Sequence, residues 1–158
     1  MLVNANTFAR RQDFTVDGVP VGANISNLPP LDHSHEGSII IVVATDAPLS
    51  HTQLTDLAKR AAIGLARTGA SSREGSGDII IAFSTANVVP YDSDHRTFET
   101  TVMDRAFINP LFVAAIESTD EAVVNALLAS YTLVGRDGNT VYALPHDRLM
   151  QLMHRYGR

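Results

Sequence analysis

The sequence predicts an α+β fold in which mixed sheets are covered by helices. Three observations predict it: two runs of β-branched residues, long stretches with apolar residues at helical spacing, and a hairpin signal near the amino end. Strands and helices of this kind bury their apolar faces only by packing in layers against each other. The chain of 158 residues corresponds to one domain, or to part of a larger one.

The first third of the chain contains the hairpin signal and the first strand. Residues 13–21 include Asp17-Gly18, a dipeptide typical of two-residue hairpin turns, and a proline that would place the second arm at a sheet edge. Residues 23–37 are polar and rich in loop-forming residues, so we expect an exposed connection. Residues 38–44 are mostly β-branched and lack polar alternation, which predicts a strand buried on both faces.

Helices dominate the rest of the sequence. Ser50 and Gln53 have the spacing of a capping box, and apolar residues follow at helical spacing as far as Gly69. A loop of small residues, 71–77, then leads to a second predicted strand over 78–84. The remaining expected elements are a long helical stretch over about 104–130 with Pro110 near its start, a short hairpin over 133–144 and a terminal helix over 147–156.

Composition excludes several classes of protein. The net charge of −5 and the pI of about 5.6 argue against a nucleic-acid partner. The apolar runs are too short to span a bilayer, so no membrane partner is expected. The absence of cysteine excludes disulfides and thiolate chemistry, and it is compatible with the cytoplasmic location that we expect.

A serine that opens a buried strand directly after a glycine has a specific chemical use. If the bond between Gly37 and Ser38 breaks, Ser38 acquires a free α-amine, whose reference pKa is about 7.7 to 8. Such an amine can act as the base that activates the hydroxyl of the same residue. Gly37 tolerates the strained backbone that a self-cleaving bond needs. Taken alone, this pair is more often simply the start of a strand.

Ser76-Gly77-Asp78 stands at the start of the second predicted strand. If the two strands are neighbours, Ser76 and Asp78 lie close to Ser38, where a carboxylate can hold an ammonium or a hydroxyl in place. One alternative is a turn in which Asp78 satisfies local backbone donors. A phosphate-binding loop is a more distant alternative, because the lysine and the glycine spacing of a P-loop are absent.

The connection before Gly37 offers one further possibility. Its last residues, Asp32-His33-Ser34-His35-Glu36, have side chains that can bind a metal. A solvated loop is the favoured interpretation, and we expect neither a metal nor another cofactor.

Four stretches of the chain resemble the L-aminopeptidase/D-esterase family, which includes the β-peptidyl aminopeptidases. The matches are long, come in the same order and cover nearly the whole chain; they are residues 37–49, 64–69, 75–87 and 135–145. The resemblance implies a four-layer αββα sandwich and self-cleavage of the Gly37–Ser38 bond into an α and a β chain. Residues 1–37 would be the end of the α-chain portion with the processing loop, and residues 38–158 the β-chain portion that carries the nucleophile, both within one structural domain. Most of the family's α chain is expected to be missing.

The resemblance also implies roles for individual residues. Ser38 matches the family's nucleophile, and Ser76 and Asp78 match the serine and the acidic residue that orient it. Asn6 resembles the asparagine that donates to the oxyanion, although Asn4, two residues away, is an alternative alignment.

The expected function is that of a serine aminopeptidase, amidase or esterase without a cofactor. By resemblance, its substrates would be short peptides, amino-acid amides or esters with a free N-terminus, and its partners a second copy in a homo-oligomer or a missing α-type chain. The alternative is a non-processing remnant, or a subunit of a split enzyme with an interaction role only. The expected loss of α-chain sequence favours that alternative, whereas the intact Gly37, Ser38, Ser76 and Asp78 favour the hydrolase.

Overall fold

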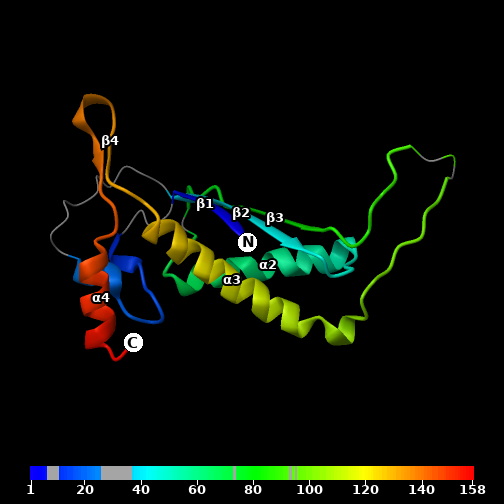
Figure 1. Cartoon of the computed structure of the whole chain (residues 1–158), viewed down its shortest axis with the longest axis horizontal. Helices are drawn as coiled ribbons and strands as arrows, with labels where there is room; N and C mark the ends of the chain where they lie inside the picture. The colour runs from blue at the N-terminus through cyan, green and yellow to red at the C-terminus, as the bar shows by residue number, and fades with distance from the viewer. Residues whose placement is uncertain (7–10, 26–36, 73, 93, 95) are drawn as a thin grey trace.

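The computed structural model describes residues 1–6, 11–25, 37–72, 74–92, 94 and 96–158. It confirms the predicted α+β class, with one three-stranded sheet, a small hairpin and helices along one side (Figure 1). The longer elements are β1 (Leu2–Asn6), β2 (Ser38–Thr45), α2 (His51–Arg67), β3 (Ile79–Ser84), α3 (Asn109–Leu128) and α4 (His146–Arg155). The shorter ones are η1 (Arg11–Asp13), α1 (Val21–Asn24), η2 (Arg105–Phe107), β4 (Leu133–Val134), η3 (Arg136–Gly138) and β5 (Thr140–Val141).

The three-stranded sheet has β2 at its centre. β1 pairs with β2 in antiparallel register, with Leu2 opposite Val42 and Asn6 opposite Ser38. β3 pairs with β2 on the other side in parallel register, starting with Ile40 beside Ile79. The two predicted strands are therefore neighbours, and both begin at the same end of the sheet.

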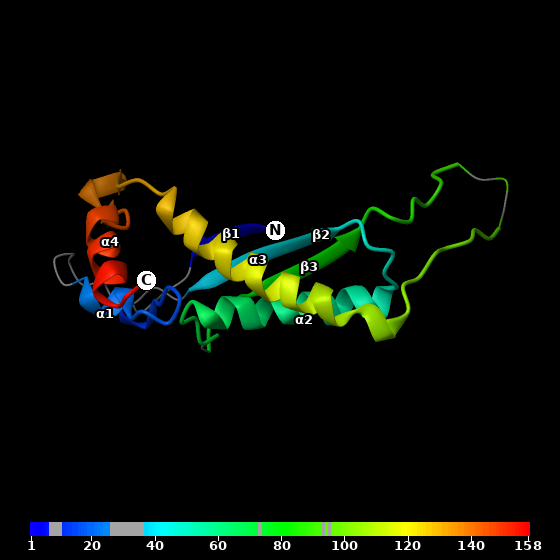
Figure 2. The ribbon, with the colours of Figure 1, turned by 60° about the horizontal axis from the view of Figure 1, so that its bottom comes forward.

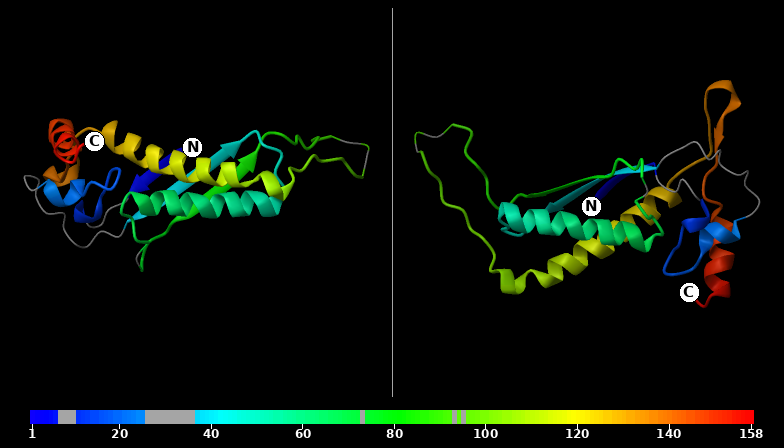
Figure 3. Two further views of the ribbon diagram at one scale, coloured as in Figure 1. Left: turned by 90° about the horizontal axis from the view of Figure 1, so that it is seen from below. Right: turned by 180° about the vertical axis from the view of Figure 1, so that it is seen from behind.

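Helices α2 and α3 cover one face of this sheet (Figures 2 and 3). The alternate residues Ile39, Ile41 and Val43 of β2 point into that interface and are buried with apolar side chains of both helices. Full burial of a side chain of this size contributes about 1.5 to 3 kcal/mol. The main core of the molecule therefore lies between β2 and the two helices.

The opposite face of the sheet is exposed, which corrects the prediction that both strands are buried on two faces. Ile40 of β2 is 45% exposed, and Ile79 and Ile81 of β3 are 54% and 52% exposed. The β-branched runs are apolar on both faces, which is why the sequence predicts strands buried on two sides. The three-stranded sheet has a helical layer on only one of them.

Helix α2 begins where the sequence predicts it. The Ser50 hydroxyl accepts from the Gln53 backbone N–H at 3.3 Å, and the Gln53 side chain accepts from the Ser50 N–H at 2.9 Å, which is the predicted capping box. The buried Gln53 side chain also donates to the Met103 carbonyl at 2.8 Å. Its second role, holding the segment before α3, could not be predicted from local sequence.

The amino-terminal hairpin is shorter than predicted. Asp17 and Gly18 form the turn, with φ angles of 47° and 75°, and Val16 and Val19 form the single bridge beside it. Of the predicted second arm, residues 19–21, Val19 alone forms a bridge, and Val21 after Pro20 begins the short helix α1. Proline has no N–H with which to continue the ladder, and Val21 is fully buried in a second core cluster with Leu149 and Leu152 of α4.

Two segments extend away from the body of the molecule (Figure 1). One is the predicted hairpin formed by β4 and β5. The other connects β3 to η2, and its base is closed by Asn87, whose side chain donates to the Thr101 carbonyl at 2.9 Å and accepts from the Thr101 N–H at 3.0 Å. None of the described helices is long and apolar enough to cross a membrane.

Candidate active site

Ser38 is the first residue of the central strand. Its backbone lies opposite Asn6 of β1 on one side. On the other side, the parallel pairing with β3 begins two residues later, with Ile40 beside Ile79. If the same register is extended two residues toward the amino end, Gly77 lies beside Ser38. The amino ends of β2 and β3 thus bring together two segments that lie about forty residues apart in the chain.

A hydrogen bond joins these two segments. The Gly77 backbone N–H donates to the Ser38 hydroxyl oxygen at 3.0 Å. Ser38 is half-buried, and it alternates with the inward-facing Ile39 and Ile41, so it belongs to the face of the sheet that the helices leave open. Its hydroxyl is therefore held by a backbone donor on the accessible side of the sheet.

The neighbouring carboxylate is held in the same way by hydroxyl groups. The Ser76 hydroxyl donates to Oδ1 of Asp78 at 2.7 Å. The Ser72 hydroxyl donates to Oδ2 of the same carboxylate at 2.9 Å. Ser72 was not singled out from the sequence, where it belongs to an undistinguished loop of small residues, and no local signal marks it.

The structure brings together most of the predicted site residues. Ser38, Ser76 and Asp78 lie at one end of the sheet, and Gly37 directly precedes the strand and is half-buried. Asn6 is the register partner of Ser38, whereas Asn4 pairs with Ile40 farther along the strand. The backbone register thus favours Asn6 over Asn4 as the asparagine nearer to Ser38, and the role of its side chain stays a prediction.

Two carboxyl groups outside the candidate site have shifted pKa values, and both lie on helices. The hydrogen bond from Arg105 lowers the pKa of Asp56 on α2 below its ordinary value. Partial burial raises the pKa of Asp120 on α3. Neither carboxyl group is hydrogen-bonded to a residue of the candidate site in the part of the chain that the structure describes.

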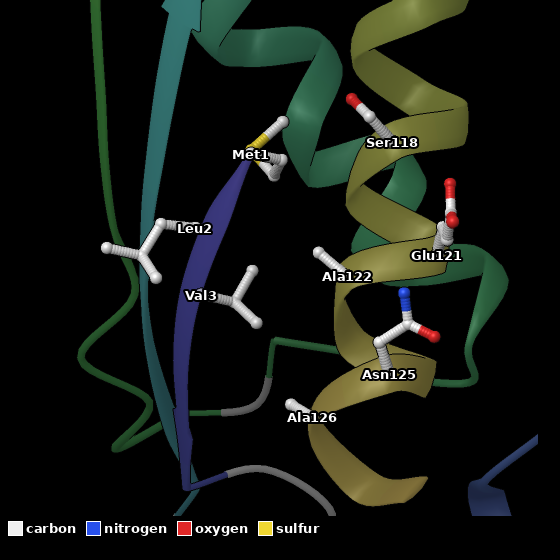
Figure 4. Close-up of a pocket in the computed structure, with 8 residues that line it drawn as sticks. All are labelled: Met1, Leu2, Val3, Ser118, Glu121, Ala122, Asn125 and Ala126. Atoms are coloured by element: carbon white, nitrogen blue, oxygen red, sulfur yellow. The ribbon is translucent and has the colours of Figure 1, made fainter. Parts of the chain in front are cut away.

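The described residues contain no group of three or more side chains suited to hold a metal ion. The segment of residues 32–36, which the sequence singled out for this possibility, lies outside the described residues. An open pocket of about 480 Å³ lies between β1 and α3, where Met1, Val3, Glu121 and Asn125 are among its lining residues (Figure 4). It is at the end of β1 that pairs with Val42, away from Ser38.

This arrangement contains the parts of a nucleophilic site. A hydroxyl beside a Gly–Ser bond, a backbone donor on its oxygen, and a carboxylate that accepts from a serine hydroxyl are groups from which acyl-transfer sites are built. These groups lie at the amino ends of two paired strands, so the pairing of β2 with β3 sets their separation.

Comparison with solved structures defines the class of fold. The chain superposes on the L-aminopeptidase D-Ala-esterase/amidase of Ochrobactrum anthropi with a TM-score of 0.83 and 36% identity, over 94% of this chain and 41% of that one. That enzyme is described as a prototype for the serine aminopeptidases and as a new variant among the Ntn hydrolase fold. The PH0078 protein of Pyrococcus horikoshii OT3 matches with a TM-score of 0.84 and 44% identity, over 99% of this chain and 43% of that one.

Sequence comparison gives the family. The model of peptidase family S58 matches residues 1–141, and the chain belongs to this family. The β-peptidyl aminopeptidase BapA of Sphingosinicella microcystinivorans is 38% identical over 172 residues, which include 100% of this chain and 43% of that protein. The chain therefore spans less than half the length of the curated relative that it matches. The resemblance predicted from the sequence is confirmed.

Proposed function

We propose that this chain is the nucleophile-bearing part of a serine aminopeptidase that cleaves itself between Gly37 and Ser38. The observation that carries the proposal is the Ser38 hydroxyl, held at 3.0 Å by the Gly77 N–H at the start of the central strand. Membership of a peptidase family supports hydrolysis of an amide as the reaction. Two of these relatives are aminopeptidases, which supports an aminopeptidase rather than an endopeptidase.

The proposed reaction begins with the free α-amine of Ser38. This amine takes the proton from the Ser38 hydroxyl while the oxygen attacks the substrate carbonyl carbon. The amide or ester bond of the substrate then breaks, the leaving group takes the proton, and the acyl group stays on the Ser38 oxygen. Water hydrolyses this ester and restores the free serine. Ser76 and Asp78 orient the amino terminus, and Asn6 donates to the oxyanion.

The substrates that we propose are short peptides, amino-acid amides and esters with a free N-terminus. The relatives support this class, because an aminopeptidase acts on a substrate with a free N-terminus. The described site offers no groups that would separate L, D and β residues.

The exposed face of the sheet supports the proposal that this chain binds a partner. Its apolar residues belong to all three strands and are Leu2, Ile40, Ile79, Ile81 and Phe83. A continuous apolar surface of this kind is typical of an interface. An α-type chain laid across it would cover the strands and the site beside Ser38, and a second copy of this chain is the other occupant that we consider.

The test of self-cleavage is the intact mass of the purified chain. We expect two fragments, residues 1–37 and 38–158, and we expect the Ser38→Ala variant to give a single uncleaved mass. Asn6→Ala should slow the cleavage about a hundredfold, as loss of one oxyanion donor does. A single mass for the unmodified chain would contradict the proposal.

The substrate class has its own test. Cleaved protein should release the amine from amino-acid p-nitroanilides and not from the same compounds after N-acetylation. Equal rates on free and acetylated compounds would show that a free N-terminus is not required.

A second candidate function is that of a subunit with an interaction role only. The exposed apolar sheet face favours it, because that face provides an interface whether or not Ser38 is active. An uncleaved chain that nevertheless binds an α-type chain would support this candidate.

A further inference from the structure

The carboxylate of Asp78 is bound by two hydroxyl groups, one on each oxygen. Ser76 donates to Oδ1 at 2.7 Å, and Ser72 donates to Oδ2 at 2.9 Å. Hydrogen bonds to an ionised acceptor are among the stronger ones in proteins. With both oxygens bound from different directions, the plane of the carboxylate is fixed rather than free to rotate about its terminal bond.

Ser72 reaches this carboxylate from an unusual backbone conformation. Its φ is 38°, in the left-handed region that residues with a Cβ atom seldom adopt. Among the described residues, the other non-glycine residues with positive φ are Asp17 and Asp137, and each precedes a glycine in a turn. Ser72 has no such turn chemistry. Strained conformations of this kind persist where the surrounding contacts hold them, and they cluster at functional sites.

When the Asp78 carboxylate is held in place, the two residues before it, Ser76 and Gly77, are held as well. The Ser76 hydroxyl donates its hydrogen bond to Asp78, so the Ser76 oxygen can still accept a hydrogen bond from a donor in the site. Gly77, between these two residues, donates its N–H to the Ser38 oxygen at 3.0 Å. A rotation of the Asp78 side chain would therefore loosen Ser76 directly and Gly77 through the backbone.

We propose that Ser72 is a positioning residue, which holds the Asp78 carboxylate so that Ser76 and Gly77 keep their places beside Ser38. It does not touch the substrate or Ser38 itself. This inference rests on the proposed function for its catalytic consequence, but the hydrogen-bond network that it describes can be tested without turnover.

Three substitutions separate the hydroxyl of Ser72 from its backbone conformation. Ser72→Gly keeps the positive φ without strain and removes the donor. Ser72→Asn also tolerates the left-handed region and restores a donor through its amide. Ser72→Ala removes the donor and keeps the strain. Ser130→Ala is the matched control, because Ser130 is also exposed and its hydroxyl donates to the Leu127 carbonyl at the end of α3.

The first readout is the rate of cleavage after Gly37 in the full chain. We expect Ser72→Gly and Ser72→Ala to slow it about tenfold, the loss of one hydrogen bond to a charged group, and Ser72→Asn to restore most of the rate. In the cleaved enzyme kcat should fall with KM unchanged, since Ser72 does not bind substrate. A Ser72→Gly variant as fast as the unmodified chain would overturn the inference.

The second readout is hydrogen exchange at the Gly77 amide, which needs no catalysis. We expect this amide to exchange about tenfold faster in Ser72→Gly and Ser72→Ala than in Ser72→Asn, the unmodified chain or Ser130→Ala. If the unmodified chain does not cleave itself, the proposed function fails, and this exchange measurement alone decides on the inference. Equal exchange in all five proteins would overturn it.

Discussion

Gly77 lies close to Ser38, although the two residues are about forty positions apart in the chain. A Cβ atom added to Gly77 would lie 3.3 Å from the Ser38 hydroxyl oxygen, and among the described residues other than its chain neighbours no further atom would lie within 4 Å of it. This separation is tighter than most Cβ contacts, so any side chain at this position pushes against the Ser38 hydroxyl. The glycine at position 77 is therefore explained by its closeness to Ser38 rather than by packing in the core.

Gly77→Ala is therefore predicted to slow the cleavage after Gly37 about tenfold or more, because small displacements of reacting groups have large kinetic effects. The free energy of unfolding should change little, since the added methyl group meets only Ser38. Cleavage is followed by intact mass and stability by urea titration. Gly135→Ala is the control, because its Cβ would only contact the Asn139 carbonyl at 3.4 Å. Equal cleavage rates in both variants would contradict the prediction.

At the residue scale, the site residues that the sequence predicts are those at the starts of strands. Ser38, Ser76 and Asp78 could be named from the sequence because each stands at the start of a β-branched run, and the resemblance assigned their roles. Ser72 could not, because its proposed role depends on a backbone conformation with φ of 38° and on a hydrogen bond from its hydroxyl to Asp78. The sequence of a loop of small residues does not show which of its hydroxyl groups reaches the carboxylate.

Helices α2 and α3 pack so closely that Gly64 has no room for a side chain. A Cβ atom at this position would run into the Ile116 carbonyl oxygen and lie 2.7 Å from Cβ of Thr119. Both obstacles belong to the facing helix, and one of them is backbone. The glycine therefore sets the separation of the two helices that support the sheet.

Gly64→Ala is predicted to lower the free energy of unfolding by about 1 to 3 kcal/mol, the usual cost of overpacking. Alanine is the better helix former by about 1 kcal/mol, but a gain of that size does not offset a clash with backbone. The comparison is Ala66→Ser on the exposed side of α2, which should stay within about 0.5 kcal/mol of the unmodified chain. Unchanged urea midpoints for both variants would show that α3 can move away.

At the scale of elements, periodicity and capping were reliable guides. The capping box of Ser50 and Gln53, the end of α2 before Gly69 and the terminal helix all lie where the sequence predicts them. The amino-terminal hairpin was wrong beyond its turn. Asp17-Gly18 does turn the chain, but the residues after Pro20 gain more by burying Val21 and Ile25 against α4 than by extending a two-stranded ribbon.

The whole molecule leaves one apolar face of its sheet uncovered. Leu2, Ile81 and Phe83 are 68%, 52% and 44% exposed, although the alternate residues of the same strands belong to the core. Exposed surfaces of this type favour association. Ser38 lies on this same face, so a partner that covers the strands would also affect the candidate site.

We predict that the purified chain associates with itself, or with an α-type chain, through this face. The double variant Ile79→Lys with Ile81→Lys should weaken association at least tenfold without a large loss of stability, because both side chains are about half exposed. Ile63→Lys on α2, where the side chain is 47% exposed, is the control for added charge. Sedimentation equilibrium measures the effect, and a strictly monomeric unmodified chain would contradict the prediction of self-association.

The sequence by itself determined the α+β class, the helices α2, α3 and α4, and the residues that open β2 and β3. These follow from local patterns, since spacing, capping and strand starts are set by neighbours along the chain. The resemblance gave the family, whereas β1 and α1 were not predicted. Only the tertiary structure decided that the strands are covered on one face, that Gly77 donates to Ser38, and that Ser72 holds Asp78. These facts depend on contacts between segments distant in sequence, whose geometry no local pattern contains.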